Sequence, residues 1–369
     1  MRTVDAAGLP IGDGHPPRVM GVLNLSPASP YDPSVFEDPA AAARYVDGLV
    51  EEGADIVDVG LESANKRFEV KPADWELDRL DLALDTLERV EADPVFSIET
   101  RYGEVAEAAL SGGFDMVNDV AGFADPELPA VCADHGAAVV KMAGGGDLER
   151  PGAVEDVDAI YDALAEDLTE KTIVDPAFGG WTESKTLADD RETFRRLREF
   201  RGLGQPILVS INRKNFLKDL VGRDTEGALP ASLGATAMAV ERGANVVRTH
   251  DVAETRDAAL VGYAFARERA CVGPVEELDV TTVAEAERHL ERVGGATDGA
   301  GELVGGAYRI DGLDDAAAER LTAAAADTGV QVASGPDAAV VGGTAAALDD
   351  LADRLDGGPL AALTRAIRA

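Results

Sequence analysis

Short runs of Val, Ile and Leu recur along the first 250 residues of the chain, and longer segments of mixed polarity separate them. Near-continuous apolar runs of this kind are typical of strands buried on both faces of a parallel sheet. The pattern predicts strands at residues 19–25, 55–60, 95–99, 115–118, 137–142, 172–175, 206–210 and 245–249.

The segments between these runs carry apolar residues at the spacing of an amphipathic helix, most clearly at 40–52, 76–90 and 230–242. Gly53 and Gly243 follow two of them, where a glycine supplies the left-handed cap that ends a helix. Strands that alternate with helices pair in parallel through right-handed crossovers. Eight such units predict the α/β class and a closed (β/α)8 TIM barrel, with a doubly wound open sheet as the alternative.

The pattern changes after residue 270, where the sequence becomes rich in Ala, Asp and Gly. We expect a barrel domain over residues 1–270, a linker over 271–280 and a small α+β domain over 281–369. Its expected strands are 303–310, 329–333 and 337–342, and its expected helices lie near 281–292, 313–327 and 343–354. No chemical motif stands out in this appendage, so packing or oligomerisation is its expected role.

The chain carries 69 acidic and 34 basic residues, and the resulting net charge of -35 is spread along the sequence. Such a surface repels a polyanion, which argues against a nucleic-acid partner. Only seven of the basic residues are lysine. Because the Debye length falls to about 3 Å at about 1 M salt, surface carboxylates repel one another little under those conditions. We therefore expect a soluble, halophilic protein of a salt-rich cytoplasm.

Two absences narrow the class of protein further. Cys132 and Cys271 lack the spacing of a disulfide framework or of a structural zinc site. The N-terminus lacks a basic segment followed by an apolar one, and no window approaches 18 apolar residues. These features favour a cytoplasmic protein with no membrane partner.

Polar side chains end nearly every predicted strand, and in a (β/α)8 barrel these ends form the mouth that holds the active site. They are Asn24, Glu62, Glu99, Asn118, Asp119, Lys141, Asp175, Asn212, Arg213, Lys214, Asn215, Arg248 and His250. A single polar residue at a strand end is usually a satisfied structural group, but so many at one mouth indicate a site. Because lysine is scarce, a lysine at a strand end is less readily explained as a solubilising surface residue. Lys214 is therefore a strong candidate for the site, and Lys141 is a weaker one. Arg248 and His250 are potential anion ligands, so the site favours a small anionic substrate.

Several motifs in register resemble the dihydropteroate synthase family, the pterin-binding barrel enzymes of folate biosynthesis. They are VMGVLNLSP (19–27), GADIVDVGLES (53–63), FSIETRYGEVAEAALSGGFDMVNDVAGF (96–123), TIVDPAFG (172–179), PILVSINRKNFL (206–217) and GANVVRTHDVAET (243–255). The resemblance runs from about residue 18 to about residue 268. It implies a transferase that condenses a 6-hydroxymethyl-dihydropterin diphosphate with an arylamine, such as p-aminobenzoate, and releases diphosphate.

The resemblance also implies roles for individual residues. Asn24 would help to hold the Mg²⁺ that neutralises the diphosphate, and Arg248 and His250 would bind the diphosphate itself. The groups that would grip the pterin ring are Glu99, Asn118, Asp175 and Lys214, and Asn215 is a further expected substrate-binding residue. Lys214, Arg248 and His250 are the expected catalytic residues. Barrels of this family are often dimers, so a homodimer is a further expectation.

The chain departs from the family in its two substrate loops, 26–32 and 61–67. Residues 26–30 read S-P-A-S-P where the family has T-P-D-S-F, and residues 63–67 read S-A-N-K-R where it has S-T-R-P. Glu99 replaces an Asp, Asn215 replaces a Ser, and Gly180 stands where a Phe is common. Pterin binding is therefore better supported than use of p-aminobenzoate. A pterin-dependent methyltransferase, a non-catalytic pterin-binding relative and a lyase with a Schiff base on Lys214 remain alternatives.

Overall fold

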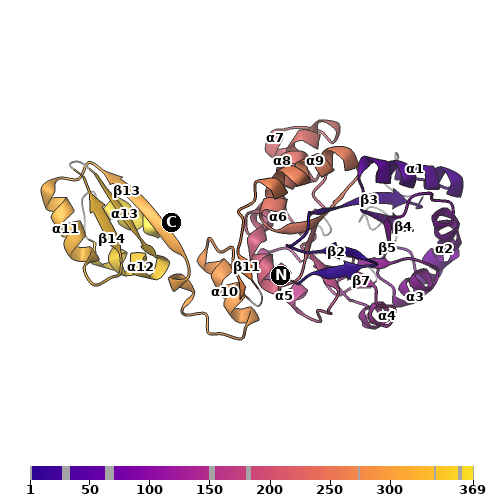
Figure 1. Ribbon diagram of the computed structural model, residues 1–369, viewed down its shortest axis with the longest axis horizontal. Helices are drawn as coiled ribbons and strands as arrows, with labels where there is room; N and C mark the ends of the chain where they lie inside the picture. The colour runs from indigo at the N-terminus through magenta and orange to yellow at the C-terminus, as the bar shows by residue number, and fades with distance from the viewer. Residues whose placement is uncertain are drawn as a thin grey trace. The chain divides into compact units, whose positions relative to one another are not determined.

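A computed structural model of the chain describes residues 2–26, 34–62, 70–148, 154–179, 184–272, 275–335, 338–355 and 360–368. Most of the two predicted substrate loops, and Gly180, lie outside these residues. The chain divides into two compact units, Met1–Glu268 and Arg269–Ala369 (Figure 1). In the described part of the chain, no helix is long and apolar enough to cross a membrane.

Eight parallel strands close the first unit into a barrel, which confirms the predicted fold class and excludes the open sheet. They are β3 (Arg18–Asn24), β4 (Ile56–Gly60), β5 (Val95–Thr100), β6 (Met116–Asp119), β7 (Ala138–Met142), β8 (Thr172–Asp175), β9 (Ile207–Val209) and β10 (Ala244–Thr249). Neighbours in sequence pair in order, and β10 closes the barrel against β3 with Arg248 opposite Met20. Strand ends from distant parts of the sequence therefore meet at one mouth.

Helices alternate with the strands and surround the barrel (Figure 1). They are α1 (Pro39–Glu52), α2 (Ala73–Leu87), α3 (Gly103–Ser111), α4 (Leu128–Asp134), α5 (Val157–Ala165), α6 (Leu187–Arg195), α7 (Asn215–Val221), α8 (Leu229–Glu241) and α9 (Val252–Ala264). Helix α1 shows how the sequence sets these limits. The Asp38 carboxylate accepts the backbone N–H of Ala41 at the first turn, and Gly53 ends the helix with a φ of 105°.

A hairpin that the sequence did not predict precedes the barrel: β1 (Val4–Ala6) pairs antiparallel with β2 (Leu9–Ile11). Its apolar side chains pack with the inner residues of the barrel, including Met20, Ile56 and Val246. Because Met20 and Val246 lie early in their strands, the hairpin closes the end opposite to the predicted site. The site therefore has a single open mouth on a packed barrel.

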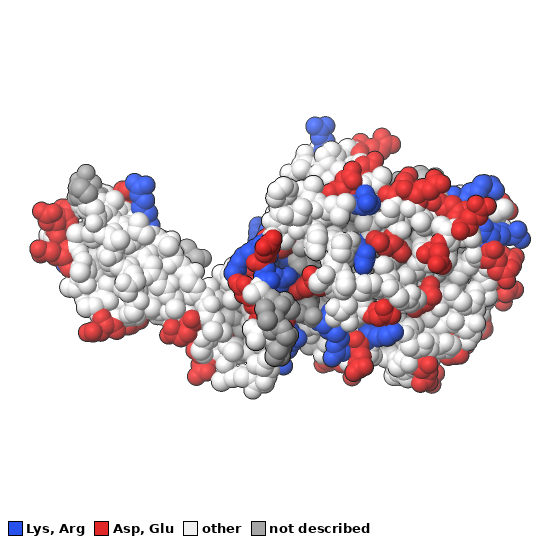
Figure 2. All heavy atoms as spheres, viewed as in Figure 1, with Lys and Arg blue, Asp and Glu red and all other residues white. Residues whose placement is uncertain are grey.

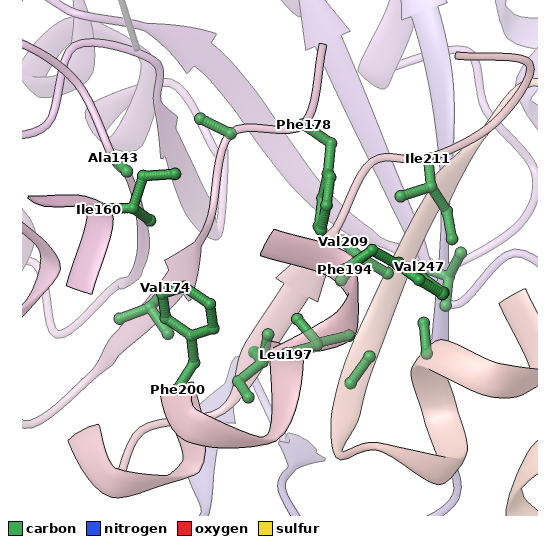
Figure 3. Packing of buried hydrophobic residues seen from close by; sticks show 14 of the residues in the cluster. Ala143, Ile160, Val174, Phe178, Phe194, Leu197, Phe200, Val209, Ile211 and Val247 are labelled. Atoms are coloured by element: carbon green, nitrogen blue, oxygen red, sulfur yellow. The ribbon is translucent and has the colours of Figure 1, made fainter. Parts of the chain in front are cut away.

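A second apolar cluster fills the space between the sheet and helices α5 to α8 (Figure 3). Phe178 points into this cluster from the loop after β8, and its ring lies 6.1 Å from Phe194 and 5.9 Å from Phe216 between centroids. Phe216 is the second residue of α7 and follows Lys214 by two positions. The aromatic packing thus fixes the backbone beside two predicted site residues, Asp175 and Lys214.

The second unit contains the paired strands β11 (Cys271–Val272) and β12 (Val275–Glu276), which lie where a linker was expected. A three-stranded antiparallel sheet follows, in the order β13 (Gly305–Asp311), β15 (Ala338–Thr344), β14 (Gln331–Ser334). The helices of the unit are α10 (Val283–Arg292), α11 (Asp315–Ala325), α12 (Ala345–Arg354) and α13 (Leu360–Ile367). Ile310, Leu321, Val341, Leu351 and Leu363 form its core. The second unit is therefore the small α+β appendage that the sequence predicted.

Candidate active site

Asp58 lies at the centre of the barrel mouth, on β4, and its side chain is completely buried. It accepts hydrogen bonds from Ser97 Oγ at 2.8 Å, Asn118 Nδ2 at 2.9 Å and Arg248 Nε at 2.7 Å. It therefore orients an amide and a guanidinium that the sequence assigned to the site. Asp58 itself was missed, although a carboxylate inside the apolar run IVDVG was a signal that could have revealed it.

Glu99, at the end of β5, accepts a hydrogen bond from Arg248 Nη2 at 2.6 Å. Burial raises the pKa of Glu99, and the Arg248 guanidinium opposes this rise. Arg248 is thus held between Asp58 and Glu99, whereas the sequence assigned it to an anionic ligand. An anion that reached Arg248 would meet a guanidinium already paired with two carboxylates.

Asp175, at the end of β8, and Lys214, on the loop after β9, lie close together on the other side of the mouth. The Asp175 Oδ1 atom accepts the backbone N–H of Ala177 at 2.8 Å. Burial raises the pKa of Asp175, while the Ala177 hydrogen bond and the Lys214 ammonium lower it. Burial conversely lowers the pKa of Lys214, and Asp175 opposes that change. The two groups stabilise each other's charged forms, which gives the mouth an acceptor and a donor side by side.

Gly179 makes the approach of Lys214 possible. Its φ is +117°, and a Cβ atom built on it would lie 3.1 Å from Lys214 Nζ and 3.3 Å from Lys214 Cδ. Two further buried groups, Lys185 and Asp190, support the same turn: Lys185 Nζ donates to the Ala177 carbonyl at 2.7 Å, and Asp190 Oδ1 accepts Gly179 N–H at 3.1 Å. Sequence reasoning missed both, although the scarcity of lysine could have drawn attention to Lys185.

His250 and Arg213 lie on the loops that follow β10 and β9. Burial and the neighbouring Arg248 lower the pKa of His250 to about 3, so its imidazole is neutral at pH 7. Arg213 donates to both carboxylate oxygens of Asp251, with Nε–Oδ2 2.7 Å and Nη2–Oδ1 2.8 Å. It also donates to the carbonyls of Thr225 and Glu226. Arg213 therefore joins the two loops and keeps His250 and Lys214 near each other.

Arg101 ties together the loops on the β4 and β5 side. Its Nη1 donates to Glu62 Oε2 at 2.6 Å, and the two side chains are 2% and 8% exposed. Its other nitrogens donate to the carbonyls of Lys71 and Leu148 and to the Tyr102 hydroxyl. Arg101 thus links Glu62, inside the predicted second substrate loop 61–67, to Lys71, which lies beyond that loop.

The remaining candidates lie in different surroundings. Lys141 Nζ donates to the carbonyls of Ala163 at 2.9 Å and Glu166 at 2.6 Å, so it caps the end of α5 away from the mouth. Asn215 is the exposed first residue of α7. Asn24 ends β3, and its Nδ2 donates to Ser34 Oγ at 2.6 Å.

Asn24 could supply one oxygen ligand, its Oδ1 atom, to a metal ion at this mouth. Because Nδ2 is bound to Ser34, Asn24 Oδ1 faces Gly60, 3.5 Å from where a Cβ atom on that glycine would lie. Among the described residues, no group of three or more His, Cys, Asp or Glu side chains could hold a metal. One amide oxygen fits a Mg²⁺ ion that takes its other ligands from water and substrate phosphates, as Mg²⁺ commonly does.

Comparison with known proteins decides the family. A sequence model of the family described as pterin binding enzymes matches residues 20–250. A dihydropteroate synthase of Synechocystis is 32% identical over 267 residues, which cover 66% of this chain and 90% of that protein. The chain belongs to the dihydropteroate synthase family. The range that the family model matches contains every strand of the barrel except the first two residues of β3.

Other members of the dihydropteroate synthase family show how varied these relatives are. A protein of Haloferax volcanii named as a probable bifunctional folylpolyglutamate synthase/dihydropteroate synthase is 35% identical over 259 residues. The match covers 67% of this chain but only 30% of that protein, so the chain spans about a third of the length of this relative. A Mycobacterium tuberculosis relative, 33% identical over 64% of this chain and 79% of its own length, is named inactive dihydropteroate synthase 2.

Solved structures of dihydropteroate synthases share the barrel. The Xanthomonas albilineans enzyme with 4-aminobenzoic acid has a TM-score of 0.60 and 32% identity, and the match covers 71% of this chain and 97% of that one. The Thermus thermophilus enzyme in complex with 6HMPPP has a TM-score of 0.58 and 32% identity, covering 72% and 100%. These two matches leave 29% and 28% of the chain uncovered, and the second unit holds 101 of the 369 residues.

Proposed function

We propose that this chain is a dihydropteroate-synthase-like transferase that joins a 6-hydroxymethyl-dihydropterin diphosphate to an arylamine. The observation that carries the proposal is the grouping of Glu99, Asn118, Asp175 and Lys214 around Arg248 at one mouth of the barrel. Buried acceptors and a partly buried ammonium suit a flat heterocycle that has amino groups on one edge and a ring carbonyl nearby.

The pterin ring would bind through its edge. The Asp175 oxygen that does not hold Ala177, and the Asn118 amide oxygen, would accept its N–H groups, while Lys214 would donate to its carbonyl. Asn118 can present its oxygen because its nitrogen is bound to Asp58. Asn118 and Asp175 are buried, 4% and 7% exposed, so they would favour one orientation of the ring.

The diphosphate would bind at Arg248 and His250, with Asn24 holding Mg²⁺. When bound, the metal ion would offset the charge of the leaving diphosphate. The bond from the pterin methylene carbon to the diphosphate oxygen breaks, and diphosphate leaves with the electron pair. The arylamine nitrogen then bonds to that carbon and loses a proton. Glu99 and Asp175 stabilise the cationic character at the pterin during this exchange.

The direct test uses the whole chain at high salt with pterin diphosphate, Mg²⁺ and a panel of arylamines that includes p-aminobenzoate. We expect diphosphate release and a coupled product visible by mass spectrometry. Pterin binding without diphosphate release for any arylamine would contradict the transferase proposal. It would favour the second candidate, a non-catalytic pterin-binding protein, which the inactive relative and the altered loops support.

Replacing Gly179 by Ala should weaken pterin binding about tenfold. The new methyl group would press on Lys214 and would sit at a φ of +117°, where strain costs about 1–3 kcal/mol. Calorimetric titration with pterin and thermal unfolding measure the two effects. Gly136→Ala is the matched control, because Gly136 also has a positive φ of +62° but no atom within 4 Å of the added carbon. Equal pterin affinity in both variants would contradict the assigned position of Lys214.

Replacing Arg248 by Ala should weaken binding of pterin diphosphate more than binding of the bare pterin. Each hydrogen bond to a charged group contributes about 1.5–3 kcal/mol, which corresponds to roughly 10- to 100-fold in affinity. The change also leaves Asp58 buried without its cation, so the free energy of unfolding should fall. Titrations with both ligands test this prediction. An equal loss for the two ligands would assign Arg248 to the ring rather than to the diphosphate.

We also propose that the protein functions in concentrated salt. Acidic side chains are dispersed over the face of the barrel seen in Figure 2, with basic ones between them. Raising KCl from about 0.1 M to about 1 M shortens the Debye length from about 10 Å to about 3 Å and should relieve their repulsion. We expect a rise in Tm on the order of 10 °C, a few kcal/mol for a chain of this size. A constant Tm across that range, measured by calorimetry, would contradict the proposal.

A further inference from the structure

A buried ion pair lies beneath the two groups proposed to grip the pterin. Lys185 Nζ and Asp190 Oδ1 are 3.6 Å apart, and their side chains are 1% and 2% exposed. Helix α6 begins between them, and a reciprocal pair of hydrogen bonds between Thr186 and Asp189 fixes that beginning. The pair is therefore held on a rigid helix end.

Each member of the pair contacts the turn that follows β8. Lys185 Nζ donates to the carbonyl of Ala177, a residue whose φ of +58° is unusual for a non-glycine. Asp190 Oδ1 accepts the N–H of Gly179. The two contacts hold Ala177 and Gly179, whose positive φ values are unfavourable for most residues. The turn therefore depends on the ion pair for its conformation.

In this conformation the turn positions Asp175 and Lys214 at the mouth. The N–H of Ala177 is directed at Asp175 Oδ1, which leaves the second carboxylate oxygen for a ligand. Gly179 packs against the ammonium of Lys214. Lys185 also lowers the pKa of Asp175. Asp190 opposes the lowering of the pKa of Lys214, whereas Lys185 adds to it. The ion pair is thus coupled to both groups by geometry and by charge.

We infer that Lys185 and Asp190 are positioning residues for pterin recognition, acting through the turn at residues 175–179 on Asp175 and Lys214. The identity of the ligand in this inference rests on the proposed function. The effect of the ion pair on the turn does not. Burying this pair is costly in itself, because two desolvated ions often stabilise a fold less than apolar groups of the same size would.

Three variants separate positioning from general stability: Lys185→Met, Asp190→Asn and the double variant. Each single change leaves one buried charge without its partner, so both should lower Tm and weaken pterin binding about 10- to 100-fold. The double change removes both charges, so we expect Tm to recover in large part. Pterin affinity should stay low, because no donor then holds Ala177. A purely structural pair predicts instead that affinity recovers together with Tm, and that result would overturn the inference.

Kinetics and a matched control sharpen the result. In steady-state assays the KM for the pterin substrate should rise while the KM for the amine stays within about twofold. Asp13→Asn is the control, since Asp13 pairs with the buried Arg201 at 2.6 Å at the closed end of the barrel. It should lower Tm and leave pterin affinity unchanged.

A ligand-free measurement distinguishes failure of this inference from failure of the proposed function. Hydrogen exchange of the peptide containing residues 175–179 should be at least tenfold faster in Lys185→Met and in Asp190→Asn than in the wild type, and unchanged in Asp13→Asn. Unchanged exchange in the first two would overturn the inference. If the wild type binds no pterin but the exchange responds as expected, the proposed function fails while the positioning of the turn stands.

Discussion

Replacing Asp175 by Asn is expected to abolish pterin binding with little effect on the fold. The Asn carbonyl oxygen can still accept the N–H of Ala177, which Asp175 Oδ1 accepts at 2.8 Å. The new amide NH₂ then faces the ligand in place of the second carboxylate oxygen, and donors meet donors. Losing a hydrogen bond to a charged group costs about 1.5–3 kcal/mol, and leaving the opposed donor unsatisfied costs about 1–3 kcal/mol more, on the order of 10²–10⁴ in affinity. Titration calorimetry with the bare pterin measures the loss.

Asp119→Asn is the matched control for this experiment. Asp119 is also a buried strand-end carboxylate, but its two oxygens accept the backbone N–H groups of Ala121 and Phe123. We expect lower stability and unchanged pterin affinity. If Asp175→Asn keeps wild-type affinity, the ring does not bind at Asp175 and the proposed orientation of the substrate is wrong.

Replacing Arg101 by Met is expected to give the largest loss of stability, about 3–5 kcal/mol. Arg101 is 1% exposed and neutralises Glu62, which is 8% exposed. Burial raises the pKa of Glu76 to about 8, and the Arg101 guanidinium opposes this rise. Without Arg101, the buried Glu62 carboxylate loses its ion-pair partner, which destabilises the fold. Denaturant unfolding in concentrated salt measures the change.

Two comparisons check the origin of that loss. Arg198→Met removes a more exposed arginine that pairs with Glu241 at the surface, and its loss should be below about 1 kcal/mol. Adding Glu62→Gln to Arg101→Met should restore part of the stability, because it removes the unpaired charge. If the double variant is no more stable than Arg101→Met, the contacts of Arg101 with Lys71 and Leu148 carry its effect instead.

The barrel could be predicted from the sequence because its strands are encoded locally. Apolar runs such as IVDVG indicate buried strands by their composition alone, and Gly53 indicates the end of a helix in the same local way. The hairpin β1–β2 escaped prediction because each strand has only three residues and gains its apolar partners from the barrel interior. Such a short strand carries no periodic signal of its own.

The site could be predicted only as a set of strand ends. Position in the barrel brings Glu99, Asn118, Asp175 and Arg248 together, and it follows from strand order alone. The pairing of Arg248 with Asp58 and Glu99, or of Lys185 with Asp190, depends on side-chain directions across elements distant in sequence. For the same reason Lys141, one of only seven lysines, serves the end of α5 instead of the mouth.

The two carboxylates that hold Arg248 bear on which anions can reach it. In concentrated salt an open guanidinium would be surrounded by chloride at far higher concentration than any metabolite. Asp58 and Glu99 act as built-in counter-ions, so a simple anion gains little by approaching. A ligand that also offers hydrogen bonds to Asn118, Asp175 and Lys214 can pull the guanidinium away from them. We therefore expect the barrel mouth to select a ligand by the number of groups that it engages at once, with little dependence on the surrounding salt.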